Sequence, residues 1–195
     1  MPYWAQSIME PKRQYRFLLS GLAQGTVHEY LVKKASKPQW SMEDADHTFL
    51  NHTFKYPGRV KWENISVTIV DPGGSNDASR ILYNVLQKSG YPLPGAITGE
   101  KATKTGMQYG EGSGTTVSKA GAVNALGAQI YIKQLGPTSD NLTDAAVIET
   151  WTLHNPFIKS VKYGELSYDS EDMIEIELEL RYDWAVIATN EAPTT

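Results

Sequence analysis

Residues that could bind a metal ion gather near position 45 of the chain. They are Asp44, Asp46, His47 and His52, whose carboxylates and imidazoles are common ligands of divalent cations. A metal site needs side chains that converge, but successive side chains of a strand point to opposite faces. Three of the four residues share parity, and His47 does not. The pattern favours a solvated turn that leads into a strand, and we predict no metal site and no cofactor.

A glycine-rich segment at residues 110–115, Gly-Glu-Gly-Ser-Gly-Thr, is similar in composition to a phosphate-binding loop. It lacks the Gly-Lys-Ser/Thr ending and the strand–loop–helix setting that phosphate binding requires. His28 and His154 fall in predicted strands without an obvious acid or nucleophile partner in sequence. The chain has no cysteine, and it lacks the Gly-x-Ser-x-Gly and His-Glu-x-x-His motifs. We therefore predict no catalytic site.

Three glutamates recur at every second position near the C-terminus: Glu175, Glu177 and Glu179. Apolar and charged residues alternate from Ile174 to Trp184, within a block that runs to Ile187. Because side chains of a strand alternate between two faces, the pattern predicts one long strand with a buried apolar face and a mainly acidic, solvent-facing one. Residues 156–166 and a polar turn precede this segment, and we expect the two to form a β-hairpin.

The rest of the pattern predicts a mainly β chain with a helix. Six further strands are indicated, at residues 13–22, 28–35, 48–56, 60–70, 127–135 and 146–154. We expect the first two to form a hairpin, and Pro57-Gly58 to form a turn. Apolar residues at helical spacing predict a helix over 77–89. The expected fold is a two-sheet antiparallel β-barrel or sandwich with one flanking α-helix.

Length and composition fit one folded domain of 195 residues. The hydrophobic fraction of 41% and the charged fraction of 21% are ordinary values. We expect an N-terminal arm at residues 1–11, a single domain at 12–190 with a Gly/Thr-rich insertion or long loop at 95–127, and a C-terminal tail at 191–195. The net charge of −4 argues against a general affinity for nucleic acid. No apolar run reaches the length of a membrane span, so no membrane partner is expected.

Two blocks of short motifs follow one another in a set order. The first, at residues 49–70, has Phe-Leu-Asn, then Tyr-Pro-Gly, then Trp-Glu-Asn-Ile-Ser-Val-Thr-Ile-Val. The second, at residues 164–184, has Gly-Glu-Leu, a polar turn, and an alternating strand that ends in Arg-Tyr-Asp-Trp. Over residues 12–90 and 130–187 the chain thereby resembles the tail tube proteins of contractile-tailed, myovirus-type bacteriophages.

The resemblance implies a structural virion protein. In that family six subunits form a ring whose inner strands join into one β-barrel, and the rings stack into the hollow tail tube through which phage DNA is ejected into the host. The implied partners are other copies of the chain, the tail sheath protein, the tape-measure protein, and the baseplate and terminator proteins. DNA would pass through the lumen without specific binding. The implied location is the virion tail, assembled in the cytoplasm of the bacterial host.

Two groups of residues are candidates for roles in such a tube. Glu175, Glu177 and Glu179 could line the lumen, where carboxylates discourage adhesion of DNA. The alternative is that they face bulk solvent or pair with lysines such as Lys159 and Lys162. The polar stretch 36–48, expected as a loop between two strands, corresponds in position to a family loop that reaches the adjacent ring. Its candidates for ring stacking are Trp40, Ser41, Met42, Glu43 and Asp44.

Other functions stay open at this point. The nearest are the tube protein of a contractile injection system and a tail terminator or initiator ring, which share the fold. A β-sandwich ligand-binding module is more distant: the 11 tyrosines and 5 tryptophans could supply a sugar-binding platform, but most occupy expected core positions. An enzyme is disfavoured because no catalytic constellation is recognisable.

Overall fold

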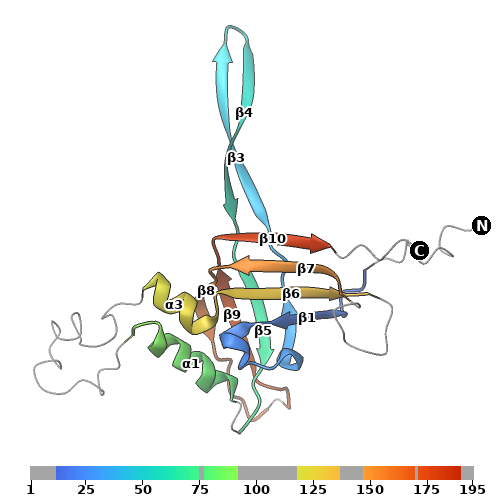
Figure 1. The fold of residues 1–195 in the computed structure, drawn as a ribbon, viewed down its shortest axis with the longest axis vertical. Helices are drawn as coiled ribbons and strands as arrows, with labels where there is room; N and C mark the ends of the chain where they lie inside the picture. The colour runs from blue at the N-terminus through green and yellow to red at the C-terminus, as the bar shows by residue number, and fades with distance from the viewer. Residues whose placement is uncertain (1–11, 75–76, 92–117, 137–146, 170, 190–195) are drawn as a thin grey trace, which may run out of the picture.

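Two four-stranded antiparallel sheets form the body of the molecule (Figure 1). The computed structural model describes residues 12–74, 77–91, 118–136, 147–169 and 171–189. The first sheet has the order β1-β6-β7-β10, with strands Phe17–Ser20, Gln129–Leu135, Val147–His154 and Trp184–Thr189. The second has the order β2-β5-β9-β8, with strands Val32–Ala35, Ile65–Val70, Glu175–Arg181 and Phe157–Lys162. The predicted mainly β, two-sheet antiparallel fold is confirmed.

A third element of β-structure is a hairpin that projects from this body (Figure 1). It consists of β3 (Trp40–Phe49) and β4 (His52–Trp62), which pair with each other and with no other strand among the described residues. Two α-helices, α1 (Ala78–Lys88) and α3 (Lys119–Leu126), lie together beside the sheets (Figure 1). Two short 3-10 turns, Leu22–Gly25 and Glu29–Leu31, connect β1 to β2.

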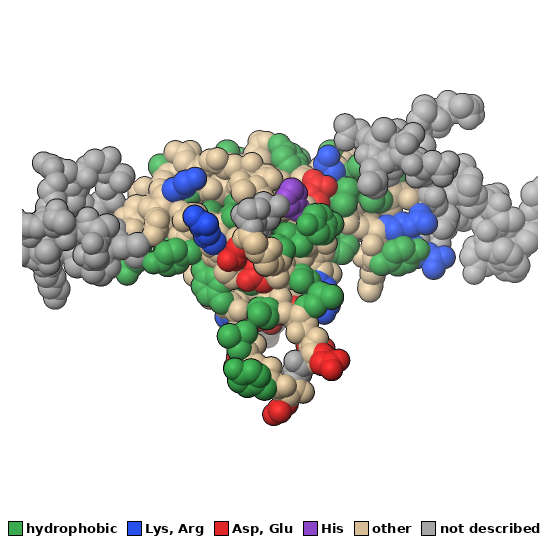
Figure 2. All heavy atoms as spheres, turned by 90° about the horizontal axis from the view of Figure 1, so that it is seen from below, with side chains coloured by type: hydrophobic (Ala, Val, Ile, Leu, Met, Phe, Trp, Pro, Cys, Tyr) green, Lys and Arg blue, Asp and Glu red, His purple; other side chains and the backbone are tan. Residues whose placement is uncertain are grey.

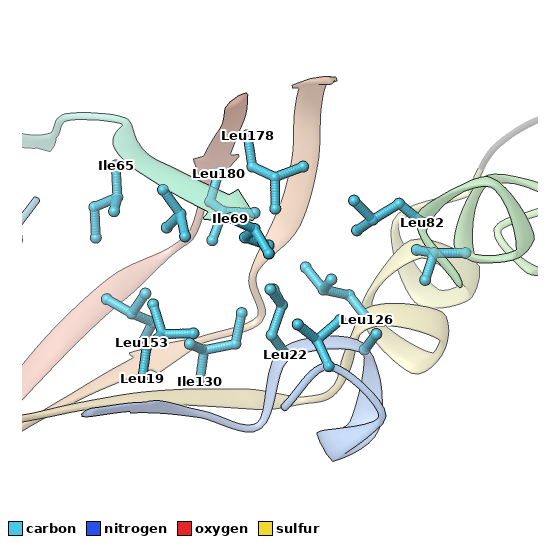
Figure 3. Packing of buried hydrophobic residues seen from close by; sticks show 14 of the residues in the cluster. Leu19, Leu22, Ile65, Ile69, Leu82, Leu126, Ile130, Leu153, Leu178 and Leu180 are labelled. Atoms are coloured by element: carbon cyan, nitrogen blue, oxygen red, sulfur yellow. The ribbon is translucent and has the colours of Figure 1, made fainter. Parts of the chain in front are cut away.

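The core lies between the apolar faces of the two sheets and is closed at one side by the helices. In Figure 3, Leu19, Ile130 and Leu153 of the first sheet face Ile65, Ile69 and Leu180 of the second, and Leu82 and Leu126 extend the cluster from the helices. Each of these side chains is almost fully buried. Burying such a side chain contributes about 1.5–3 kcal/mol, so this layer supplies the main driving force for the fold.

The predicted hairpin of residues 13–22 and 28–35 is wrong. β1 pairs with β6 and β2 pairs with β5, so the two strands belong to different sheets. The chain changes sheets at Gly21, which has a φ of 88°. A Cβ at this position would lie 2.7 Å from the backbone oxygen of Gln129, so a larger residue would clash. Period-two patterns identify strands, but they do not say which strand is the neighbour.

The chain also changes sheets within the segment predicted as one long C-terminal strand. β9 ends at Arg181 and pairs with β5 and β8, whereas β10 begins at Trp184 and pairs with β7. The carboxylate of Asp183 holds this crossing: it accepts hydrogen bonds from Lys119 at 2.6 Å and from Asn155 at 3.0 Å. These bonds, that from Lys119 first, lower the pKa of Asp183. The hairpin predicted for 156–166 with the following strand is confirmed as β8–β9.

A second helix occupies part of the segment expected to be an insertion. The single predicted helix, 77–89, matches α1, but α3 also forms within 95–127, with the Ser118 side chain accepting from the Gly121 amide at 3.0 Å as an N-cap. Helix α3 buries small residues, and Gly121 brings it close to the end of α1, because a Cβ there would lie 2.7 Å from the Ser89 oxygen. The expected arm at 1–11, the tail at 191–195 and the rest of the insertion lie outside the described residues.

One buried carboxylate joins the segments that lead into the two sheets. Glu149 on β7, only 4% exposed, accepts hydrogen bonds from Lys12, from Lys37 at 2.8 Å and from the Trp151 indole at 2.5 Å. Burial raises its pKa, but the bonds from Lys12, Lys37 and Trp151 outweigh burial and lower the pKa to about 2. Lys37 lies between β2 and β3, so this group also fixes the base of the hairpin.

Glu149→Gln should therefore destabilise the domain at neutral pH. The folded-state pKa lies below the usual 4.5, so the charged form stabilises the fold above pH 4.5 and the contribution is lost as the pH falls toward 2. A shift of this size corresponds to about 3 kcal/mol. Urea denaturation at pH 7 and pH 3 measures the difference, which should shrink at pH 3. Exposed Glu177→Gln is the matched control, and equal stability of all three proteins at pH 7 would contradict the role of Glu149.

Candidate assembly surfaces

The outward face of the β2-β5-β9-β8 sheet is polar, and it carries the three candidate glutamates. Glu177 accepts from Lys162 at 3.0 Å, and Glu175 pairs with Lys33. Glu179 accepts from Lys159 at 3.0 Å, from Asn64 at 2.7 Å and from Ser160 at 3.2 Å. The bonds from Lys159 and then Asn64 lower the pKa of Glu179, and the bond to Glu175 raises the pKa of Lys33.

Each of these three pairs is balanced in charge. Each glutamate has a lysine partner, as the alternative interpretation of the sequence expected for Lys159 and Lys162. The partners come from β8 and β2, the two outer strands of the sheet. Such exposed pairs contribute little to stability, typically below ~1 kcal/mol each. Their effect is on the potential of the surface: the lysines neutralise the three glutamates, so this face is not strongly acidic.

The two edges of this sheet have compatible directions. Each neighbouring pair in the order β2-β5-β9-β8 is antiparallel, so β2 and β8 run in opposite directions. Within the described residues, each of these outer strands pairs on one side only. If β8 of one copy lay beside β2 of another, the antiparallel alternation would continue across the junction. Open edges of this kind are sites for pairing with another chain.

The hairpin presents large apolar side chains without a core to cover them. At its tip Phe49 is 62% exposed and Leu50, with a φ of 53°, is 83% exposed. At its base Trp62 packs against Tyr182 of the domain, with ring centroids 5.9 Å apart. Ten residues of β3 at ~3.3 Å each give a projection of about 30 Å. Exposed apolar side chains gathered on an extended element indicate a contact surface.

Beyond its midpoint, the hairpin has one mainly apolar face and one polar face. Cross-strand partners share a face, so Tyr56, Phe54 and Phe49 line one side, with His47 and His52 beside them. The other side is polar: Lys55 pairs with Asp44 at 3.2 Å and Asp46 at 3.6 Å, and Thr48 meets Thr53. Asp44 and Asp46 thus bind a lysine. In the parts of the chain that the structure describes, no three His, Asp or Glu side chains are grouped to hold a metal.

The candidates for ring stacking lie in a strand, not in a loop. Trp40, Ser41, Met42, Glu43 and Asp44 all belong to β3. Pro57-Gly58 is no turn; it lies inside β4 at a bulge, where a Cβ on Gly58 would meet the Glu43 oxygen at 2.6 Å. The turn is at Leu50-Asn51. Residues 44–47 alternate Asp, Ala, Asp and His, which is a weak period-two signal for a strand. Their acidic composition favoured a loop instead.

The fold is shared with chains of solved contractile assemblies. A chain in the extended sheath–tube complex of the PVC extracellular contractile injection system is 16% identical, with a TM-score of 0.61 over 97% of this chain and 99% of that chain. A chain in the PVC sheath/tube terminator is 17% identical, with a TM-score of 0.60 over 93% and 99%. A chain in the six-fold symmetrised baseplate of the anti-feeding prophage is 14% identical, with a TM-score of 0.58 over 95% and 99%. No protein-family model and no curated protein matches the sequence.

The chain therefore has the tail-tube fold. The resemblance predicted from the sequence is confirmed at the level of the fold, and the assemblies that share it are tubes, terminators and caps rather than enzymes. None of the helices in the described residues is long and apolar enough to cross a membrane.

Proposed function

We propose that the chain is the structural subunit of the hollow inner tube of a contractile, tail-like particle. Six copies form a ring, and rings stack into the tube. The observation that carries the proposal is the β2-β5-β9-β8 sheet, whose open edges run in opposite directions and whose outward face is polar. A sheet with these properties can close into a barrel by edge-to-edge pairing of identical copies. The tail-tube fold supports the same arrangement.

On this proposal the polar face of that sheet lines the lumen. Glu175, Glu177 and Glu179 face the bore, each beside its lysine partner. Non-specific DNA binding needs an excess of positive charge, and the three glutamates lower that excess by neutralising neighbouring lysines. This fits a conduit through which phage DNA leaves the particle without specific binding. The sheath, tape-measure, baseplate and terminator proteins are the corresponding partners.

A second candidate is the tube of a contractile injection system that is not a virion. The fold shared with chains of the PVC and anti-feeding prophage assemblies favours it. The subunit architecture and the ring are the same in both candidates, and the cargo differs. A terminator ring uses the same fold and would form rings without long tubes.

Electron microscopy of the purified chain over a concentration series tests the assembly. Six-fold rings or hollow tubes are expected as the concentration rises. A strictly monomeric particle at the highest concentration, also in the presence of baseplate components that could nucleate a tube, would contradict the proposal. A monomer that binds oligosaccharide would instead favour the β-sandwich binding module.

Charge reversal tests the lumen. Replacing Glu175, Glu177 and Glu179 with lysine raises the charge of each subunit by six units, because three carboxylates are lost and three ammonium groups are gained. It also leaves Lys33, Lys159 and Lys162 without partners. In tubes that assemble normally, passage of DNA at low salt should slow on the order of tenfold and recover as salt rises.

The triple glutamine variant is the matched control for this experiment. It adds half the charge at the same positions, so an intermediate effect is expected. If DNA passes unchanged through well-formed tubes of the lysine variant, these three residues do not line the lumen.

Shortening the hairpin tests ring stacking. Ala45 and Tyr56 are directly opposite, so replacing residues 46–55 with Asn-Gly closes the hairpin with a two-residue turn and leaves its base intact. The removed part makes no contribution to the core, so the melting temperature should stay the same, and rings should form without long tubes. This variant is cleaner than deleting Ser41–Ala45, which would break the register of β3. Long tubes of normal length would show that the hairpin does not hold rings together.

A further inference from the structure

The hairpin and the β8–β9 loop, residues 163–174, leave opposite ends of the second sheet. Ile65 and Leu180 pair at the end where β4 enters the sheet, and Val70 and Glu175 pair at the end where the loop begins and returns. Figure 1 shows the hairpin at one end of the long axis of the molecule and this connection near the other. A contact between the two surfaces therefore joins different copies, and a head-to-tail contact of this kind propagates along an axis.

The β8–β9 loop frames an apolar groove of about 1170 Å³. Two features hold its frame: the Asp71 amide donates to the Ile174 oxygen at 3.0 Å, and Gly164, with a φ of 80°, turns so tightly that a Cβ would lie 2.8 Å from the Glu175 oxygen. Leu166 and Met173 line the groove and are 85% and 76% exposed. Hydrophobic and acidic side chains gather at this end of the molecule (Figure 2).

The two surfaces differ in charge. The β8–β9 loop has four acidic residues and no basic one: Glu165, Asp169, Glu171 and Asp172. The basic residues of β4 are Lys55, Arg59 and Lys61. Lys55 and Lys61 pair with carboxylates of β3, but Arg59 at the bulge has no ion-pair partner among the residues that the structure describes. Glu43, Asp44 and Asp46 of β3 balance these basic residues, so the hairpin has no net charge and the acidic loop does not repel it.

We propose that the distal half of the hairpin of one subunit docks in the β8–β9 groove of a subunit in the neighbouring ring. The inference rests on the proposed tube and names the partner surface of its hairpin. Phe49 and Leu50 cover Leu166 and Met173. The occupant is a second copy of this chain, because the apolar tip and the apolar groove lie at opposite ends of one molecule and meet when copies stack head to tail.

Cross-linking tests this contact directly, since the native chain has no cysteine. Tubes of Leu50→Cys, Leu166→Cys double variants, treated with a short bis-maleimide, should give a ladder of covalent multimers. The tip and loop lie too far apart to be linked within one subunit. Leu50→Cys combined with Asn124→Cys, on the exposed side of α3, is the matched control and should give no ladder. If tubes of the Leu50→Cys, Leu166→Cys variant form and give no ladder, the docking site is wrong and the proposed function is unaffected. If the native chain forms no ring or tube, both the docking site and the proposed function are wrong.

A second variant covers the case in which the cysteines block assembly. Leu166→Ser with Met173→Ser removes the apolar groove lining, and both side chains are exposed in the single subunit, so its melting temperature should not change. Rings should form as in the native chain, and the protein concentration needed for tubes should rise at least tenfold. Tubes of native length at the native concentration would overturn the proposal.

Discussion

The packing of two apolar sheet faces against each other is the constraint from which the other surfaces follow. Ile65, Leu178 and Leu180 point into this layer, so their sequence neighbours on the same strands must point outward. The outward face of the second sheet is therefore polar by necessity. Its polar character alone would fit any β-sandwich; the antiparallel direction of its two open edges is what makes ring closure geometrically simple.

The hairpin obeys a different constraint, because nothing in the subunit covers it. A two-stranded ribbon has little stability of its own in water. Here Trp62 anchors it on Tyr182, and Glu149 holds Lys37 at its base, so the ribbon begins from a fixed point. The apolar side chains at its tip, Phe49 and Leu50, are not covered by the domain and are consistent with burial in an assembly. In the proposed tube, burial of these side chains would favour contacts between copies.

The sequence predicts strands better than it predicts their neighbours. Strands β6 and β7, the β8–β9 hairpin and helix α1 follow directly from periodicity, and the tail-tube resemblance supplies the fold. The sheet changes at Gly21 and Asp183 cannot be predicted from periodicity, because a period-two pattern identifies a strand but not its pairing partner. Helix α3 is short and buries mainly small side chains, so its helical pattern of apolar residues is weak. For the candidate site, alternation placed Glu175, Glu177 and Glu179 on one face, but their lysine partners depend on the register between strands.

The same lysines bear on how an open sheet avoids unwanted pairing. Lysine on an edge strand discourages indiscriminate addition of another chain, since the incoming strand would bury an ammonium group. In this sheet Lys162 on β8 and Lys33 on β2 turn toward glutamates of β9, so their charges are satisfied above the sheet rather than at its rim. The backbone groups of the two edges stay accessible to a partner of the right direction. A chain of the same kind meets that condition, because its β2 edge is antiparallel to β8 and carries a lysine that is already paired.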